Sequence, residues 1–291
     1  MLRSPVLLAI AVSSAFASPQ TAAFDREGDL CIAALEHPKP RKIARGAWPQ
    51  ISPDGTRLAF NTEGPGNDTR RSVAVADVAT GKVTRFQNVP SDNCYGPIWS
   101  PDGRQIAFYI YEGNEWHIGL LDADGAHFRY LWKSDKPGHT LWSAAWAPDG
   151  KSLFCEDLDT LYRLALDGKV LARWNVAKIF PRGGLSSGSR LAPSPDGKSL
   201  LVDVDMDENV DRADWDGPPP SIWQLDLATN AAVRVTQPGQ YLWEPAWIND
   251  HEILCNGLPK NAKAPSLYRL PVSGGDPKLV IKNARDASVS R

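Results

Sequence analysis

The sequence predicts an all-β fold, a six-bladed β-propeller of four-stranded antiparallel blades closed by pairing N- and C-terminal strands. Three observations lead to this prediction. A turn motif recurs at even spacing, a second strand motif recurs six times, and the 291 residues include 24 Pro and 23 Gly. Pro and Gly are typical punctuation in chains built from many short strands rather than long helices.

The composition is that of a soluble globular protein. Hydrophobic residues make up 42% of the chain and charged residues 23%, and the mean hydropathy is -0.33. The 32 Lys and Arg nearly balance the 34 Asp and Glu, which leaves a net charge of -2. We therefore expect neither a nucleic-acid partner nor a membrane span.

The turn motif is the tetrapeptide Ser-Pro-Asp-Gly, with one Ala-Pro-Asp-Gly variant. Copies stand at Ser52–Gly55, Ser100–Gly103, Ala147–Gly150 and Ser194–Gly197, and an eroded fifth copy at Trp247–Asp250. Pro presets the first turn dihedral, Asp can bond its own backbone, and Gly supplies a positive φ. Because a short apolar run follows each copy, the motif predicts a hairpin turn between the first and second strands of a blade.

A further apolar strand follows each of these units and usually opens with a small polar residue. Its six copies begin at Asp29, Ser72, His117, Thr160, Ser221 and Ser266. Six third strands predict six blades. The turn and strand of the last blade are expected at Ser18–Phe24 and its innermost strand at Asp286–Ser290, which would close the ring. Five blades with a separate N-terminal hairpin are the alternative.

The N-terminus is predicted to be an export signal over residues 1–17. Arg3 precedes an apolar run from Val6 to Phe16, and small residues stand at Ala15 and Ala17, where signal peptidase cleaves. The run is too short to span a membrane. We expect cleavage after Ala17, a periplasmic location, and one propeller domain over residues 18–291; a buried first strand is the alternative.

The turn-plus-strand units resemble the PDG-type, WD40-like repeats of the TolB-type six-bladed propeller. The resemblance extends over nearly all of residues 18–291 and implies the fold rather than a function. TolB proteins of the bacterial envelope carry an additional N-terminal domain for which this chain has no room. The resemblance therefore says less about whether this chain shares the role of TolB in the envelope or binds the lipoprotein partner of TolB.

The inner strands supply the candidate binding residues. Counting back five positions from each turn Pro or its equivalent gives Trp48, Gly96, Ser143, Arg190, Glu244 and Asp286. This set and its preceding neighbours vary from blade to blade, as binding positions on a regular scaffold do. We predict a ligand or partner site at one channel mouth, formed by Tyr95, Trp142, Arg190, Trp243 and Glu244. The alternative is that the aromatic side chains only plug the ring. Trp99, Trp146 and Trp247 recur in register and are predicted to pack between blades.

Three other patterns are weaker candidates. Gly184–Gly188 fits GxSxG, but the strand-to-helix elbow and the acid-then-His order of α/β-hydrolases are not expected here. Residues 203–216 form an acidic insertion, interpreted as a solvated loop with calcium binding as the alternative. The His residues show no paired metal spacing. Cys31, Cys94, Cys155 and Cys255 lie far apart, and we expect free buried thiols rather than disulfides.

The sequence therefore predicts an exported, monomeric, non-catalytic propeller scaffold that binds an envelope protein segment or a small ligand at the channel mouth. No cofactor or metal is expected. The alternative is a metal-dependent propeller hydrolase or lyase that gathers its ligands around the channel.

Overall fold

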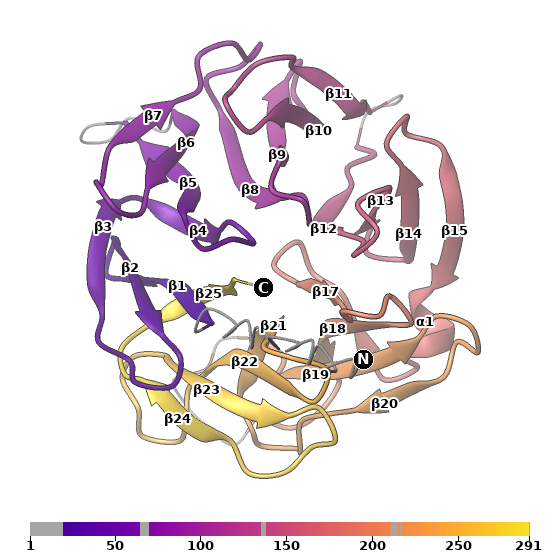
Figure 1. Cartoon of the computed structure of the whole chain (residues 1–291). Coiled ribbons are helices and arrows are strands. Elements are labelled where there is room, and N and C mark those ends of the chain that lie inside the picture. The colour runs from indigo at the N-terminus through magenta and orange to yellow at the C-terminus, as the bar shows by residue number, and fades with distance from the viewer. Residues whose placement is uncertain (1–19, 65–69, 135–137, 211–214, 216, 291) are drawn as a thin grey trace, which may run out of the picture.

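The structure is a computed structural model that describes residues 20–64, 70–134, 138–210, 215 and 217–290. Within these residues, six antiparallel sheets stand as blades around a central axis (Figure 1). This confirms the six-bladed propeller and shows that the five-blade alternative is wrong. Over the same ranges, α1 (Val176–Ile179) is the one α-helix.

The blades are numbered from the N-terminus, and the strands of each are given from the axis outward. Blade 1 consists of β25 (Arg285–Val289), β1 (Thr21–Arg26), β2 (Asp29–Ala34) and β3 (Arg41–Arg45). Blade 2 consists of β4 (Ala47–Ile51), β5 (Arg57–Glu63), β6 (Arg71–Asp77) and β7 (Val83–Arg85). Blade 3 consists of β8 (Cys94–Trp99), β9 (Gln105–Glu112), β10 (Glu115–Asp122) and β11 (Arg129–Trp132).

The second half of the ring repeats this order. Blade 4 consists of β12 (Trp142–Trp146), β13 (Ser152–Glu156), β14 (Thr160–Ala165) and β15 (Val170–Asn175). Blade 5 consists of β17 (Leu191–Pro193), β18 (Ser199–Met206), β19 (Pro220–Asp226) and β20 (Ala232–Arg234), with β16 (Gly183–Gly184) also paired to β18. Blade 6 consists of β21 (Leu242–Trp247), β22 (Glu252–Gly257), β23 (Ser266–Pro271) and β24 (Lys278–Ile281).

Blade 1 closes the ring in the predicted way. Its inner strand β25 comes from the C-terminus and pairs with β1, with Ala22 opposite Val289. The Ser290 amide donates to the Thr21 carbonyl at 2.9 Å. Ser288 Oγ accepts the Ile51 amide of blade 2 at 2.9 Å. The C-terminal strand therefore joins two blades and removes exposed sheet edges.

The turn motif has the conformation that its residues dictate. Gly55 has a φ of +73°, which L side chains adopt only with strain. Asp54 Oδ1 accepts the Thr56 amide at 3.0 Å. Ser52 Oγ donates to Asp54 at 2.6 Å and accepts the Arg57 amide at 2.9 Å. The turn therefore satisfies its own polar groups and starts the second strand.

The recurring tryptophans join neighbouring blades, as predicted. The indole N–H of Trp99 donates to the Gln50 carbonyl at 2.9 Å, and that of Trp146 donates to the Ile98 carbonyl at 3.2 Å. Trp247 makes the equivalent bond to Ala192 at 2.9 Å. Each bond reaches the inner strand of the preceding blade, so these side chains fix the spacing between blades.

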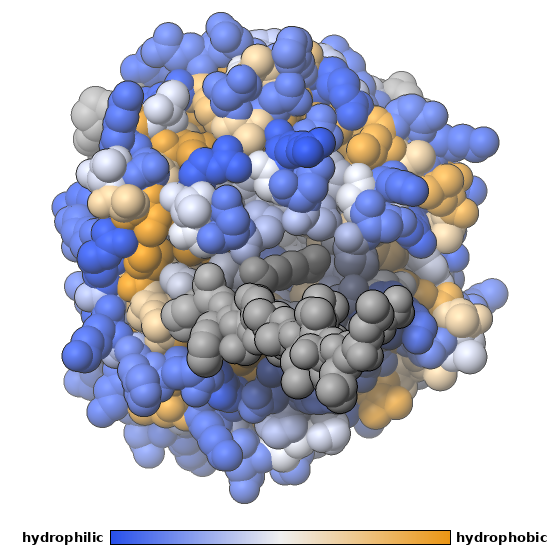
Figure 2. All heavy atoms as spheres, in the orientation of Figure 1, coloured by the Kyte–Doolittle hydropathy of each residue, from blue (hydrophilic) through white to orange (hydrophobic). Residues whose placement is uncertain are grey.

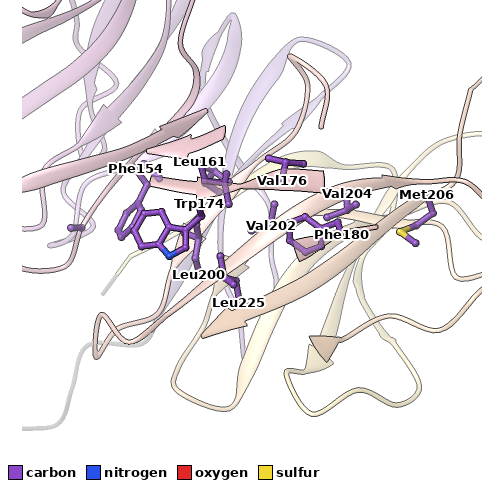
Figure 3. Close-up of a cluster of buried hydrophobic side chains, with 13 residues drawn as sticks. Phe154, Leu161, Trp174, Val176, Phe180, Leu200, Val202, Val204, Met206 and Leu225 are labelled. Atoms are coloured by element: carbon purple, nitrogen blue, oxygen red, sulfur yellow. The ribbon is translucent and has the colours of Figure 1, made fainter. Parts of the chain in front are cut away.

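Hydrophobic clusters fill the spaces between the blades. One of them packs Phe154 and Leu161 of blade 4 against Leu200 and Val202 of blade 5, with Phe180 after α1 beside them (Figure 3). All four cysteines are buried and free, as expected. Hydrophobic packing rather than disulfide bonds therefore joins these sheets.

The expected acidic loop is only partly a loop. Asp203 and Asp205 lie within β18, and Asp203 is only 6% exposed. The interpretation of Asp203 as a solvated residue is therefore wrong, because its strand runs through the interior. The additional length of this repeat is divided between the segment 176–190 before β17 and residues 207–219 after β18. The predicted acidic residues Asp211, Asp214 and Asp216 lie outside the described residues.

Candidate functional site

The inner strands share a backbone irregularity at the predicted binding position. Five of the six residues there have positive φ angles, which are 58° for Trp48, 63° for Gly96, 58° for Ser143, 53° for Glu244 and 55° for Asp286. The strand register shifts at each of these places. Such bulges cost a non-glycine residue about 1–3 kcal/mol and redirect its side chain. The surrounding structure must therefore hold them.

Buried polar residues occupy one equivalent position of the second strands, and five of the six bond a bulged inner strand. We call them the latch residues; they are Asp25, Asn61, Tyr109, Glu156, Asp203 and Asn256, and all are buried. Asn61 Oδ1 accepts the Gly96 amide of the next blade at 2.9 Å, and its Nδ2 donates to the Cys94 carbonyl at 2.8 Å. Asp203 Oδ2 accepts the Glu244 amide at 2.7 Å. Asn61 and Asp203 therefore each connect a bulge to the blade before it.

The latch varies around the ring. Asn256 Oδ1 accepts the Asp286 amide at 3.1 Å, and the Tyr109 hydroxyl accepts the Ala144 amide. Glu156 instead bonds Ser143 within its own blade at 2.9 Å. Sequence reasoning missed five of these residues and interpreted Asp203 only as part of the acidic insertion. The available signal was a polar residue directly after the apolar run of every second strand.

Arg190 contacts the opposite side of the ring. Its guanidinium carbon lies 4.0 Å from the centroid of the Trp48 ring. Arg190 precedes β17 of blade 5, and Trp48 lies on β4 of blade 2, which is the blade diametrically opposite (Figure 1). Arg190 Nε also lies 3.7 Å from Glu244 Oε1. This contact between Arg190 and Trp48 therefore spans the channel at its bulged end.

Glu244 and Asp286 form an acidic pair beside Arg190. Their side chains are only 14% and 17% exposed. Burial raises the pKa of Glu244 to about 7; the Arg190 charge opposes this shift and the Asp286 charge adds to it. Glu244 Oε2 accepts Asn256 Nδ2 at 2.7 Å. Burial also raises the pKa of Asp203 well above its ordinary value. Burial in this part of the channel therefore favours the protonated form of both Glu244 and Asp203.

An aromatic cluster lies beside the bulges of blades 2 to 4. The Tyr95 ring stacks on Tyr109 and meets the edge of Trp116, both at a centroid distance of 4.9 Å. Trp142 lies 6.4 Å from both Tyr109 and Trp116. The Arg71 guanidinium lies 4.8 Å from the Tyr95 ring. The cluster therefore presents polarisable ring surface together with a fixed cation.

Four of the five predicted site residues are connected. Trp48 lies 6.1 Å from Tyr95 and contacts Arg190, which pairs with Glu244. Trp142 joins through Tyr109 and Trp116. Trp243 does not join this group, because its ring packs 5.8 Å from Trp215 of the blade 5 insertion. Sequence reasoning placed Trp48 among the inner positions but left it, and the Trp116 and Arg71 contacts, out of the site.

A cavity of about 220 Å³ runs along the inner strands from this end. Its lining residues include Trp48, Arg190, Glu244 and Asp286 at the charged end and Ile98, Ala144, Ala246 and Ala287 further along. Figure 2 shows one face of the molecule, where hydrophilic side chains dominate and apolar ones appear in patches. The lining residues of the cavity make it charged at one end and mainly apolar along its walls.

The other sites and segments considered in the sequence can also be located in the structure. Over the ranges that the structure describes, no three His, Cys, Asp or Glu side chains gather in a way that could hold a metal ion. The loop Gly184–Gly188 lies between blades 4 and 5, and the Ser186 amide donates to Ser189 Oγ at 3.0 Å. In the described part of the chain no helix is both long and apolar enough to cross a membrane.

Comparisons with known proteins agree on the fold. No family model matches the chain. The Tol-Pal system protein TolB of Anaeromyxobacter dehalogenans is 31% identical over 83 residues, which cover 28% of this chain and 18% of that protein. TolB from Acinetobacter baumannii superposes with a TM-score of 0.65 at 16% identity, covering 94% of this chain and 66% of that one. A putative TolB from Agrobacterium tumefaciens gives 0.62 at 17% identity, covering 90% and 88%.

The same architecture also occurs in enzymes. An oligogalacturonate lyase from Vibrio parahaemolyticus superposes with a TM-score of 0.55 at 15% identity, covering 84% of this chain and 72% of that one. A puromycin hydrolase gives 0.56 at 17% identity, covering 89% and 42%. The chain thus has the six-bladed β-propeller fold that these TolB structures also show. This fold alone does not decide between binding and catalysis.

Proposed function

We propose that this protein is an exported, non-catalytic propeller scaffold that holds an envelope protein segment or a small ligand at the bulged end of its channel. The observation that supports the proposal most is the chain of contacts from Trp142 through Tyr95 and Trp48 to Arg190 and Glu244. Aromatic side chains with an arginine are the usual composition of an interaction hot spot.

The backbone supports the same location. Non-glycine residues with positive φ recur around this end of the channel, and such strain clusters at functional sites. Trp243 belongs to the proposed site as a second anchor beside Trp215. The similarity to a Tol-Pal system protein favours a protein partner in the envelope.

Export is part of this proposal. The predicted signal over residues 1–17 would deliver residues 18–291 as one periplasmic, monomeric domain. Mass spectrometry of the envelope fraction is expected to find Ser18 as the mature N-terminus. Intact Met1 in the cytoplasm would contradict export.

A metal-dependent hydrolase or lyase is the second candidate, favoured by the similarity to an oligogalacturonate lyase and a puromycin hydrolase. Such an enzyme needs a ligand set for its metal, and the described residues offer no such group. Elemental analysis of the purified protein separates the two candidates: a stoichiometric bound transition metal or calcium would favour the enzyme.

The partner can be identified by photo-crosslinking. p-Benzoylphenylalanine at position 142 is expected to trap a discrete adduct from envelope extract, because the aromatic cluster would lie under the partner. The control is the same residue at position 233, on the outer strand β20, where Val233 is 67% exposed. An adduct from position 233 together with none from position 142 would place binding on the outer rim instead.

A further inference from the structure

Arg190 has unused hydrogen-bonding capacity. Within the described residues its guanidinium carbon lies 4.0 Å from the centroid of the Trp48 ring, and its Nε forms an ion pair with Glu244 at 3.7 Å. The latter distance is too long for a hydrogen bond. A guanidinium carries five N–H donors. Arg190 therefore lines the cavity with donors that a ligand could use.

Acceptors lie directly beside these donors. Glu244 Oε2 already accepts Asn256 Nδ2, Oε1 lies 3.7 Å from Arg190 Nε, and the Glu244 carboxyl group shares a hydrogen bond with that of Asp286. Asp286 Oδ2 has an ion pair with Arg285 at 3.7 Å. Both carboxyl groups line the same cavity as Arg190. The charged end of the channel therefore combines one cation with two acids.

The cavity limits the size of the ligand. Its volume is about 220 Å³, below the range of about 300–1,000 Å³ that suits drug-sized molecules. Beyond the charged end, its walls are formed by Ile98, Ala144, Ala246 and Ala287. A ligand with one compact charged end and a short apolar group matches this shape.

We propose that the channel cavity binds a free α-amino acid with an uncharged side chain. The ligand carboxylate accepts hydrogen bonds from the Arg190 guanidinium, the ammonium donates to Glu244 and Asp286, and the side chain lies along the apolar walls. An α-amino acid carries both charges on one carbon, so it needs a cationic and an anionic residue side by side. Arg190 and Glu244 stand in this way.

Ligands with a single charge fit less well. A simple anion would lie beside the two carboxyl groups, and a simple cation would lie beside Arg190. A zwitterion meets an opposite charge on each side. This inference rests on the proposed function, because it names the small-ligand class for the same site.

The test uses uncharged L-amino acids and two matched derivatives. Calorimetry with leucine, alanine and phenylalanine is expected to show saturable binding by at least one of them. For that amino acid, the N-acetyl derivative lacks the ammonium and the amide derivative lacks the carboxylate. Each is expected to bind at least about tenfold more weakly, because it leaves one charged partner unpaired. Equal binding of either derivative, or no binding of any of them at about 10 mM, overturns the proposal.

Variants connect the binding to the named residues. Arg190→Gln and Glu244→Gln are each expected to lose at least about tenfold in affinity. Arg190→Lys retains the charge without the planar fork and is expected to bind more weakly than wild type. The control is Asp276→Asn, an exposed acid on the β23–β24 hairpin of the blade that carries Glu244. If the Gln variants keep their fold by circular dichroism and also keep wild-type affinity, the assignment is wrong.

The same experiments separate this inference from the proposed function. If Trp142→Ala abolishes partner binding while no amino acid binds, the scaffold proposal stands and the ligand assignment fails. If amino acids bind and Trp142→Ala binds the partner as wild type does, the ligand assignment stands and the scaffold proposal fails.

Discussion

Ser143 has one hydroxyl proton and two acceptors, the Glu156 carboxyl at 2.9 Å and the Ser189 carbonyl at 2.6 Å. One hydroxyl cannot donate to both of them, so the contact with Glu156 requires a proton on that carboxyl group. Burial, which raises the pKa of Glu156 to about 7, has the same consequence. The residue is therefore a neutral acid over much of the acidic range, and it links blade 4 to blade 5 through Ser143.

The sign of the pH effect follows from this raised pKa. The unfolded chain holds the Glu156 proton only below about pH 4.5, whereas the folded chain holds it up to about pH 7. The stabilising contribution is complete below the unfolded pKa and is lost as the pH rises to about 7. Glu244 acts in the same direction and over the same window.

Glu156→Gln is therefore expected to stabilise the protein at pH 8. The amide can donate to Ser143 Oγ and accept the Leu158 amide without a buried charge. We expect the gain to be at most about 3 kcal/mol. Thermal unfolding from pH 5 to pH 8 measures it: the variant should lose less stability with rising pH than wild type does. A variant that is less stable at pH 8 and as pH-dependent as wild type would show that Glu156 is already ionised at pH 5 and that burial does not raise its pKa.

The latch residues determine how neighbouring blades are joined. Five of the six second strands end their apolar run with a polar residue that bonds a bulged inner strand, in four cases that of the next blade. Asn61 makes two such bonds, to the Gly96 amide and the Cys94 carbonyl. Because both groups are buried or partly buried, their bonds are costly to lose.

Asn61→Ala is expected to lower the free energy of unfolding by about 2–4 kcal/mol, since it leaves a buried donor and acceptor unpaired. Denaturant titration measures this difference. Gln237→Ala, at an exposed amide of a connecting loop, is the control and should change stability by less than about 0.5 kcal/mol. If the two variants are equally stable, the latch does not hold the blades.

The sequence predicts the blades better than it predicts the site for a physical reason. The turn motif is local: its Pro, Asp and Gly fix one hairpin each, and every copy reports one blade. The positive φ of Trp48 or Glu244 is imposed by a latch on another blade, so no local propensity reveals it. The stacking of Trp243 on Trp215 depends on the path of an insertion. The contact of Arg190 with Trp48 depends on ring closure between opposite blades.

Closure of the ring brings the residues of the candidate site together across the channel. Arg190 and Trp48 face each other only because β25 completes blade 1. That strand supplies Asp286 to the charged end and Ser288 to the Ile51 amide. Stability and the geometry of the channel therefore depend on the same C-terminal strand.

Deleting residues 286–291 is expected to lower the melting temperature by at least about 10 °C, because blade 1 loses its inner strand and the edge of β1 is exposed. Differential scanning calorimetry measures the change. Ser288→Ala, which removes only the bond to Ile51, should cost much less. An unchanged melting curve for the deletion would mean that the ring does not depend on this closure.

Binding at the bulged end of the channel is the central claim, and the affinity of the cross-linked partner for Trp142→Ala measures it most directly. Loss of a hot-spot tryptophan is expected to cost at least about 2 kcal/mol, or roughly a thirtyfold loss of affinity. Trp142→Phe should lose less, and Leu279→Ala on the outer strand β24, where Leu279 is 47% exposed, should bind as wild type does. Wild-type affinity in a stably folded Trp142→Ala, with loss in Leu279→Ala, would contradict the claim.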